Sequence, residues 1–174
     1  TGDNLVANIS TVVSEGELKI ENKNKCNFVR GEHNDVTVYV TAPYIKSFVQ
    51  EGVGSIFGTN TVIQDTAYTN ILNAGDIHLD VKVAGVMSHT HGIGDLYLSG
   101  AANGFYSNIV GQGFVRAENL AVAYCFIDFR SNGLAKVNTK WLDCVIASTG
   151  NIYYTGDPFV VNAEIKGTGK LVKF

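Results

Sequence analysis

Proline and charged residues are scarce in this sequence. Only 2 of its 174 residues are proline, and charged residues make up 17% of the chain, against about a quarter in typical globular proteins. With 45% hydrophobic residues, this composition excludes a disordered chain, which combines low hydrophobicity with high net charge. Because a chain of this length can bury a continuous core, we expect a single domain over residues 1–174.

Three further absences narrow the class of protein. The formal net charge is −3 and the sequence has no basic stripe, so nucleic acid is not expected as a partner. No run of 18 apolar residues occurs, so we expect no transmembrane segment. Cys26, Cys125 and Cys144 cannot all pair and lack the C-x-x-C spacing of zinc sites. We therefore expect buried free thiols.

The chain begins at Thr1 without an initiator Met or an apolar leader. We therefore expect the N-terminal part of the domain to be truncated and its targeting signal to lie outside this sequence.

What the sequence does contain is a repeat. Residues 92–98 read Gly, any residue, Gly, polar, apolar, any residue, apolar, and related units recur along the chain. The equivalents of its second glycine are Gly16, Asn34, Gly54, Gly75, Gly94, Gly113, Gly133, Gly150 and Gly169. Their spacings are 18, 20, 21, 19, 19, 20, 17 and 19 residues. A period of roughly 19 residues is typical of a solenoid in which each repeat forms one coil.

The residues that follow each anchor alternate between apolar and polar. Two positions after the anchor stand Leu18, Val36, Ile56, Ile77, Leu96, Val115, Ala135, Ile152 and Leu171. Most residues at the intervening positions are polar, which predicts strands with one buried face. Only residues 86–91 lack a strand-like pattern, and no stretch keeps helical spacing. We predict an all-β, single-domain parallel β-helix (β-solenoid) of about nine coils of roughly 19 residues, with a right-handed winding favoured.

Several segments of the chain resemble a known family. They are residues 3–6, 15–20 and 36–43, the Gly-x-Gly coils, and residues 150–158, which read Gly-Asn-Ile-Tyr-Tyr-Thr-Gly-Asp-Pro. Together they resemble the putative auto-transporter adhesin, head GIN domain family, a bacterial domain of unknown function. Ser131-Asn132-Gly133 departs from the double glycine of the coils.

The resemblance implies a β-helical domain of a Gram-negative bacterium in an extracellular, cell-surface or periplasmic location. It also implies an adhesive or polysaccharide-binding role. It brings no catalytic residues with it.

Two outward positions gather residues that can carry chemistry. Asp76 and Asp95 stand at the same position of adjacent coils, and His78 and Tyr97 share a position two residues further on. Stacked carboxylates on a β-helix face serve calcium binding and acid–base catalysis in polysaccharide-degrading enzymes. Polar pairs are also ordinary on a solvated sheet, so the same residues are consistent with a purely structural surface. Contact with glycan is the third alternative.

A second pair is His89 and His91, which point the same way if they lie on a strand. Imidazole is the commonest protein ligand for metals, but a site needs a third ligand, and Asp95 lies beyond the glycine corner. We therefore expect polar turn residues, with no metal, cofactor or catalytic site.

The candidate binding surface consists of Asp76, His78, His89, His91, Asp95 and Tyr97. The family resemblance, together with the outward aromatic residues Phe57, Tyr97 and Tyr153, implies a non-enzymatic adhesin that binds glycan or protein through its outward sheet. A polysaccharide lyase or hydrolase and a self-assembling structural element remain alternatives.

Overall fold

The computed structural model describes residues 6–24 and 36–174, and the chain forms two compact units, Thr1–Ala42 and Pro43–Phe174. The first unit contains an antiparallel hairpin of β1 (Ile9–Ser14) and β2 (Glu17–Asn22). Glu15 and Gly16 form its turn, both with positive φ. A two-residue turn with positive φ at both positions matches the twist of a hairpin, so Gly16 is a hairpin turn residue and not a coil corner.

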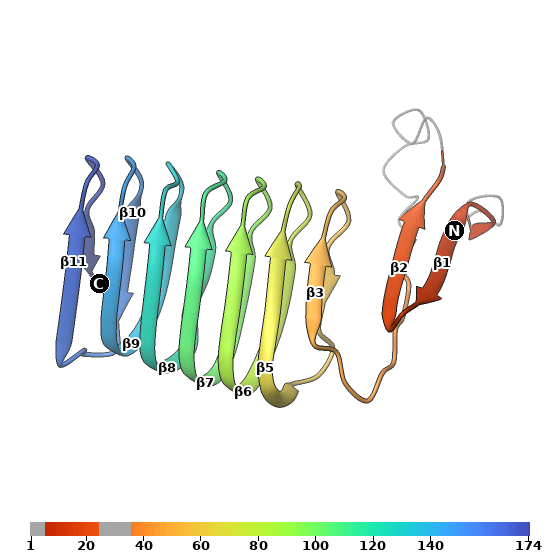
Figure 1. The fold of residues 1–174 in the computed structure, drawn as a ribbon, viewed down its shortest axis with the longest axis horizontal. Helices are drawn as coiled ribbons and strands as arrows, with labels where there is room; N and C mark the ends of the chain where they lie inside the picture. Colours follow the sequence, from red (N-terminus) through yellow and green to blue (C-terminus); the bar gives the residue numbers. More distant parts are fainter. Residues whose placement is uncertain (1–5, 25–35) are drawn as a thin grey trace. The chain divides into compact units, whose positions relative to one another are not determined.

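The second unit is a parallel β-solenoid (Figure 1). It has about seven turns. Its strands are β3 (Ser47–Gln50), β4 (Ile56–Phe57), β5 (Val62–Ile71), β6 (Ile77–Thr90), β7 (Leu96–Ile109), β8 (Val115–Phe129), β9 (Leu134–Ile146), β10 (Asn151–Thr155), β11 (Val160–Ile165) and β12 (Leu171–Lys173). The sheet order is β12-β10-β9-β8-β7-β6-β5-β3, with β11 paired to β9 and β4 to β6. Residues 36–174 contain no helix. The predicted β-solenoid is confirmed.

The register of the coils follows the predicted spacings. The parallel partners include Ile56 with Ile77, Ile77 with Leu96, Leu96 with Val115, Val115 with Ala135, Ala135 with Ile152, and Ile152 with Leu171. The steps between these partners are 21, 19, 19, 20, 17 and 19 residues. The count of nine coils was too high, because Gly16 belongs to the hairpin, residues 36–40 form no strand, and the anchor Asn34 lies outside the described residues.

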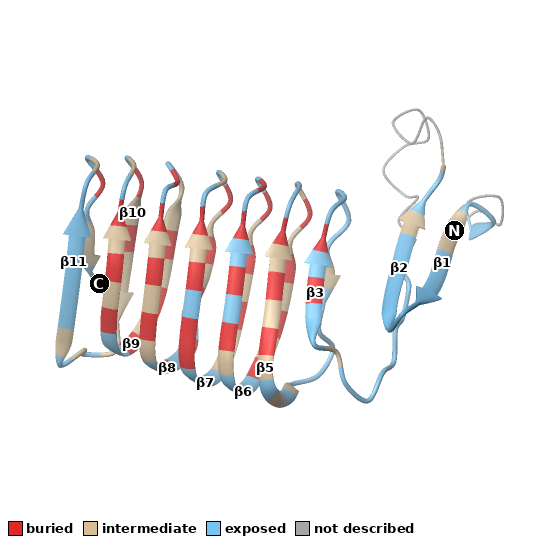
Figure 2. Ribbon diagram, in the orientation of Figure 1, coloured by how far each residue is buried: buried red, intermediate tan, exposed pale blue. Residues whose placement is uncertain are grey.

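Buried residues recur on successive long strands of the solenoid (Figure 2), and they form one hydrophobic core cluster. One column of these residues contains Ile77, Leu96, Val115, Ala135 and Ile152, all fully buried. A second column, from the later part of each long strand, contains Val86, Phe105, Cys125 and Leu142, also fully buried. Each inward side chain is covered by its equivalents in the neighbouring coils, which removes its apolar surface from water.

The double-glycine corners allow the coils to approach closely. A Cβ added at Gly92 would overlap the backbone of Asn73, and one added at Gly94 would overlap the carbonyl oxygen of Gly75. Neither glycine has a positive φ among the described backbone angles. Close approach of neighbouring backbones, and not an unusual conformation, therefore accounts for glycine at this corner.

Candidate functional site

Four of the six predicted site residues come together on one outward face. His78 pairs in register with Tyr97, and Tyr97 with Arg116, because the coils advance by 19 residues here. Asp76 and Asp95 stand two residues before His78 and Tyr97, at the entry to β6 and β7. We call Asp76, His78, Asp95, Tyr97 and Arg116 the polar column.

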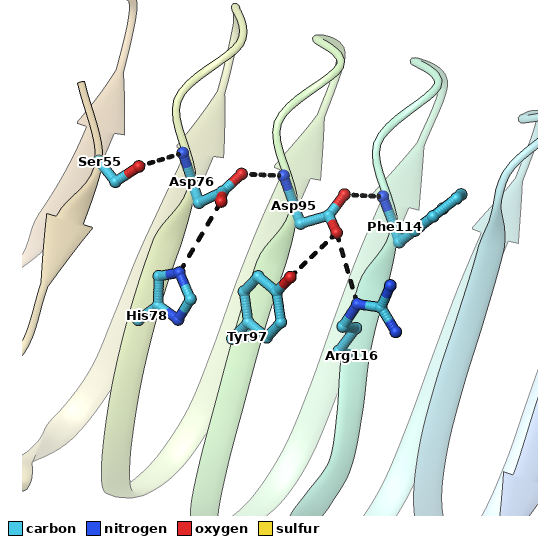
Figure 3. A network of polar contacts seen from close by, with 7 residues as sticks. All are labelled: Ser55, Asp76, His78, Asp95, Tyr97, Phe114 and Arg116. Atoms are coloured by element: carbon cyan, nitrogen blue, oxygen red, sulfur yellow. Dashed lines mark hydrogen bonds and ion pairs between the residues drawn. The ribbon is translucent and has the colours of Figure 1, made fainter. Parts of the chain in front are cut away.

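The carboxylates of the column bond to the backbone of the next coil (Figure 3). Asp76 Oδ1 accepts the backbone N–H of Asp95 at 2.7 Å, and Asp95 Oδ1 accepts that of Phe114 at 2.8 Å. Ser55 Oγ accepts the N–H of Asp76 in the same way, at 3.1 Å. Each side chain therefore satisfies a backbone donor where a strand begins, which stabilises the corner.

The second oxygen of each carboxylate faces another member of the column. Asp95 Oδ2 accepts hydrogen bonds from Tyr97 Oη at 3.2 Å and from Arg116 Nε at 3.4 Å, and His78 Nε2 lies 3.9 Å from Asp76 Oδ2. Burial, followed by the charge of Asp95, raises the pKa of Tyr97. Burial alone would lower the pKa of Arg116, but its contacts with Asp95 and Tyr97 outweigh burial and raise it.

The rings of the column stack on one another. Phe57 and His78 have ring centroids 4.6 Å apart at 19°, and His78 and Tyr97 have centroids 4.1 Å apart at 6°. The Arg116 guanidinium carbon lies 5.6 Å from the centroid of the Tyr97 ring. Since Phe57, Tyr97 and the Arg116 guanidinium cover faces of the His78 and Tyr97 rings, these two rings present mainly their edges.

Arg116 was not among the predicted site residues. Its position in the repeat is that of His78 and Tyr97, one coil further along the chain. That shared position was the sequence signal that could have found it.

His89 and His91 do not join the polar column. His89 pairs in register with Asn70 and Asn108, on the later part of β6. The His89 and His91 rings lie 6.1 Å apart. In the described ranges 6–24 and 36–174, no group of three or more His, Cys, Asp or Glu residues could hold a metal ion.

His91 lines a shallow groove of about 760 Å³ across the corner loops. Gln112, Arg130 and Asn132 contribute to the same groove. Arg130 is engaged by Asp128, whose Oδ1 lies 3.0 Å from Arg130 Nε.

A row of aromatic side chains elsewhere on the solenoid was missed in the sequence. Its members, which we call the aromatic strip, are Tyr106, Tyr124, Trp141 and Phe159. Successive ring centroids lie 5.6, 6.2 and 5.9 Å apart at interplanar angles of 51°, 63° and 79°. Phe159 is 73% exposed, Tyr106 43% and Trp141 38%.

One carboxylate holds the middle of the strip. Asp143 accepts hydrogen bonds from Tyr124 Oη at 2.9 Å, Trp141 Nε1 at 3.1 Å and Asn162 Nδ2 at 2.7 Å. Burial, and then the bond to Asp143, raise the pKa of Tyr124 to about 12. The orientation of both rings is therefore fixed by the same acceptor.

Fold and surface together define a parallel β-solenoid with ordered polar and aromatic columns on its outside. The chain belongs to the family described as "Putative auto-transporter adhesin, head GIN domain", whose model matches residues 1–158. The predicted family is therefore confirmed.

Among solved structures, the chain is similar to the crystal structure of a putative adhesin from Bacteroides fragilis. The two share 21% sequence identity with a TM-score of 0.83, over 99% of this chain and 79% of that one. A comparison with curated proteins found no match. Among the described residues, no helix is long and apolar enough to cross a membrane.

Proposed function

We propose that this chain is a non-enzymatic adhesin domain at the cell surface or in the periplasm that binds glycan or protein through its outward faces. Its family is described as "Putative auto-transporter adhesin, head GIN domain", and the similar protein from Bacteroides fragilis is described as a putative adhesin. Both descriptions support this role. The expected surface or periplasmic location has the same basis.

One observation carries the proposal: the carboxylates of the polar column are already bonded within the sheet. Both oxygens of Asp95 accept hydrogen bonds from the protein, and Asp76 Oδ1 accepts the N–H of Asp95. A general acid or nucleophile needs an oxygen directed at the substrate. A column fixed in this way instead offers a rigid surface, which loses little side-chain entropy when a partner binds.

An array of glycans and extracellular matrix proteins tests the proposal. We expect specific binding of at least one ligand by the wild-type protein. Absence of binding to every glycan and protein on the array would contradict it, and so would turnover of any glycan in a product assay.

Arg116→Ala and Tyr97→Ala then test the polar column as the contact surface, with Lys82→Ala, an exposed position on β6, as control. Loss of binding in the first two variants alone assigns the contact to the column. Equal binding in all three assigns it to another outward face.

A further inference from the structure

We infer that the aromatic strip is a binding surface for an extended, neutral glycan of equatorial pyranose residues, which would lie across the coils. The inference rests on the proposed function and names both the surface and the class of ligand. It depends on the geometry of four rings and of the polar groups beside them.

The rings of the strip are arranged differently from those of the polar column. In the column, the His78 ring stacks nearly parallel between Phe57 and Tyr97, at 19° and 6°, so both of its faces are covered. In the strip, Trp141 meets Phe159 at 79°. Tilted and edge-on pairs leave part of the ring faces open, and the C–H faces of pyranose rings pack against such faces.

The strip runs from coil to coil because a glycine makes room for one ring. Gly104 pairs in register with Tyr124, and Tyr124 with Trp141. A Cβ added at Gly104 would lie 3.0 Å from the Tyr106 ring, which therefore lies over the glycine. Tyr106 thus continues the row that Tyr124 and Trp141 form. The ring spacing of 5.6 to 6.2 Å is close to the rise of one sugar residue in an extended chain, so successive rings can meet successive sugars.

The charges beside the strip favour a neutral ligand over an acidic one. Asp143 lies against Tyr124 and Trp141 and carries a negative charge there. The nearby cation Lys140 donates to the Gly156 carbonyl oxygen at 2.7 Å, and Lys166 pairs with Glu164. An acidic glycan would meet a carboxylate and cations that already have partners, whereas sugar hydroxyls can use the remaining acceptor capacity of Asp143.

Tryptophan fluorescence gives a direct test, because Trp141 is the single tryptophan of the chain. The probes are cellohexaose and chitohexaose, with a hexamer of galacturonic acid as the acidic comparison. We expect a saturable change in Trp141 emission with a neutral hexasaccharide. No change with either neutral probe, or a stronger response to the acidic one, would overturn the inference.

Calorimetry with variants assigns the surface. Phe159→Ala and Trp141→Ala are expected to weaken binding of the neutral probe by about tenfold each. Lys82→Ala, at an exposed position of β6, and Arg130→Ala are expected to leave it unchanged. Because Phe159 is 73% exposed, its variant should keep the wild-type fold, which circular dichroism checks. Unchanged affinity in both strip variants, or loss in Lys82→Ala or Arg130→Ala instead, would overturn the inference.

The array described above separates the two failures. If the strip variants lose no ligand but the wild-type protein still binds a glycan or a matrix protein, only the inference fails. If the wild-type protein binds nothing, the proposed function fails with it.

Discussion

The Asp76 carboxylate accepts the backbone N–H of Asp95, 19 residues later, at 2.7 Å. Asp95 repeats this bond to Phe114 in the next coil. In the sequence these two aspartates look most like a catalytic pair. In the structure, each carboxylate instead accepts a backbone N–H just before a strand of the next coil begins. The side chain at this position therefore has a structural role, which is to satisfy a backbone donor of the next coil.

Replacing Asp95 should test that role. Asp95→Ala removes the side-chain acceptor of the Phe114 N–H and the partner of Arg116, so we expect a loss of about 1–3 kcal/mol in the free energy of unfolding. Asp95→Asn keeps an acceptor oxygen and should lose less. Urea denaturation measures both, with the exposed Asp65→Ala as a control expected to change by about 0.5 kcal/mol or less. Equal losses for alanine and asparagine would contradict a backbone-capping role.

Gly94, at a corner, and Gly85, on β6, should respond in opposite ways to replacement by alanine. Gly94→Ala places a Cβ against the backbone of Gly75, where only a backbone shift can relieve the overlap, so we expect a loss of about 1–3 kcal/mol. Gly85, on β6, has nothing within 4 Å of an added Cβ. Gly85→Ala should be neutral or stabilise by up to about 1 kcal/mol, because alanine restricts the unfolded chain. Thermal unfolding compares the two, and equal Tm shifts would show that the coils do not touch at the corner.

The coil spacing could be predicted because each coil repeats the same local pattern. Six successive spacings between Gly54 and Gly169 match the observed register. The failure at Gly16 has a local cause, since alternating residues around a glycine fit an antiparallel hairpin as well as a coil. Alternation of apolar and polar residues shows that a strand has one buried face, but it does not show which strand pairs with it.

Polar residues at inward positions hid part of the strand pattern. Residues 86–91 lacked apolar alternation, yet β6 continues through Thr90, with Ser88 and Thr90 buried. Ser88 Oγ donates to Ser107 Oγ at 2.7 Å in the next coil, which satisfies a buried hydroxyl. That compensation depends on a residue 19 positions away.

The aromatic strip was missed for a similar reason. Tyr106 does not occupy the same register position as Tyr124, and its ring joins the row only by lying over Gly104. The register identifies only which backbone positions are neighbours. The Tyr106 ring reaches the row because its side chain points toward Gly104, which the register does not predict.

Low pH should decrease the free energy of unfolding, partly because Asp143 becomes protonated. Burial raises the pKa of this carboxyl, but hydrogen bonds from Asn162, Trp141 and Tyr124 outweigh burial and lower it below its usual value. A folded-state pKa below the unfolded one contributes stability that is complete above the unfolded pKa, about 3.9, and is lost as the pH falls through the folded value. Asp143→Asn should therefore reduce the loss of unfolding free energy between about pH 6 and pH 3.

Urea denaturation at the two pH values measures this effect, with Asp65→Asn as the exposed control. An acid-induced loss in Asp143→Asn as large as in the wild-type protein would show that Asp143 does not contribute.

Two of the three cysteines should be inert in the folded protein. Cys125 and Cys144 are free thiols, 0% and 3% exposed, and Cys26 lies outside the described residues. Burial raises the pKa of Cys125, and raises that of Cys144 to about 11 with a smaller contribution from Asp143. At about pH 8 both are therefore protonated, and the reactive thiolate is scarce.

A chromogenic disulfide reagent measures this in a Cys26→Ser background, where only Cys125 and Cys144 can react. In native buffer we expect labelling at the rate of global unfolding, because both side chains must leave the core to reach the reagent. In concentrated urea both thiols should react within the mixing time of the assay. Rapid labelling of one thiol in native buffer would show that its coil opens locally, and separate Cys125→Ala and Cys144→Ala variants would identify which coil does so.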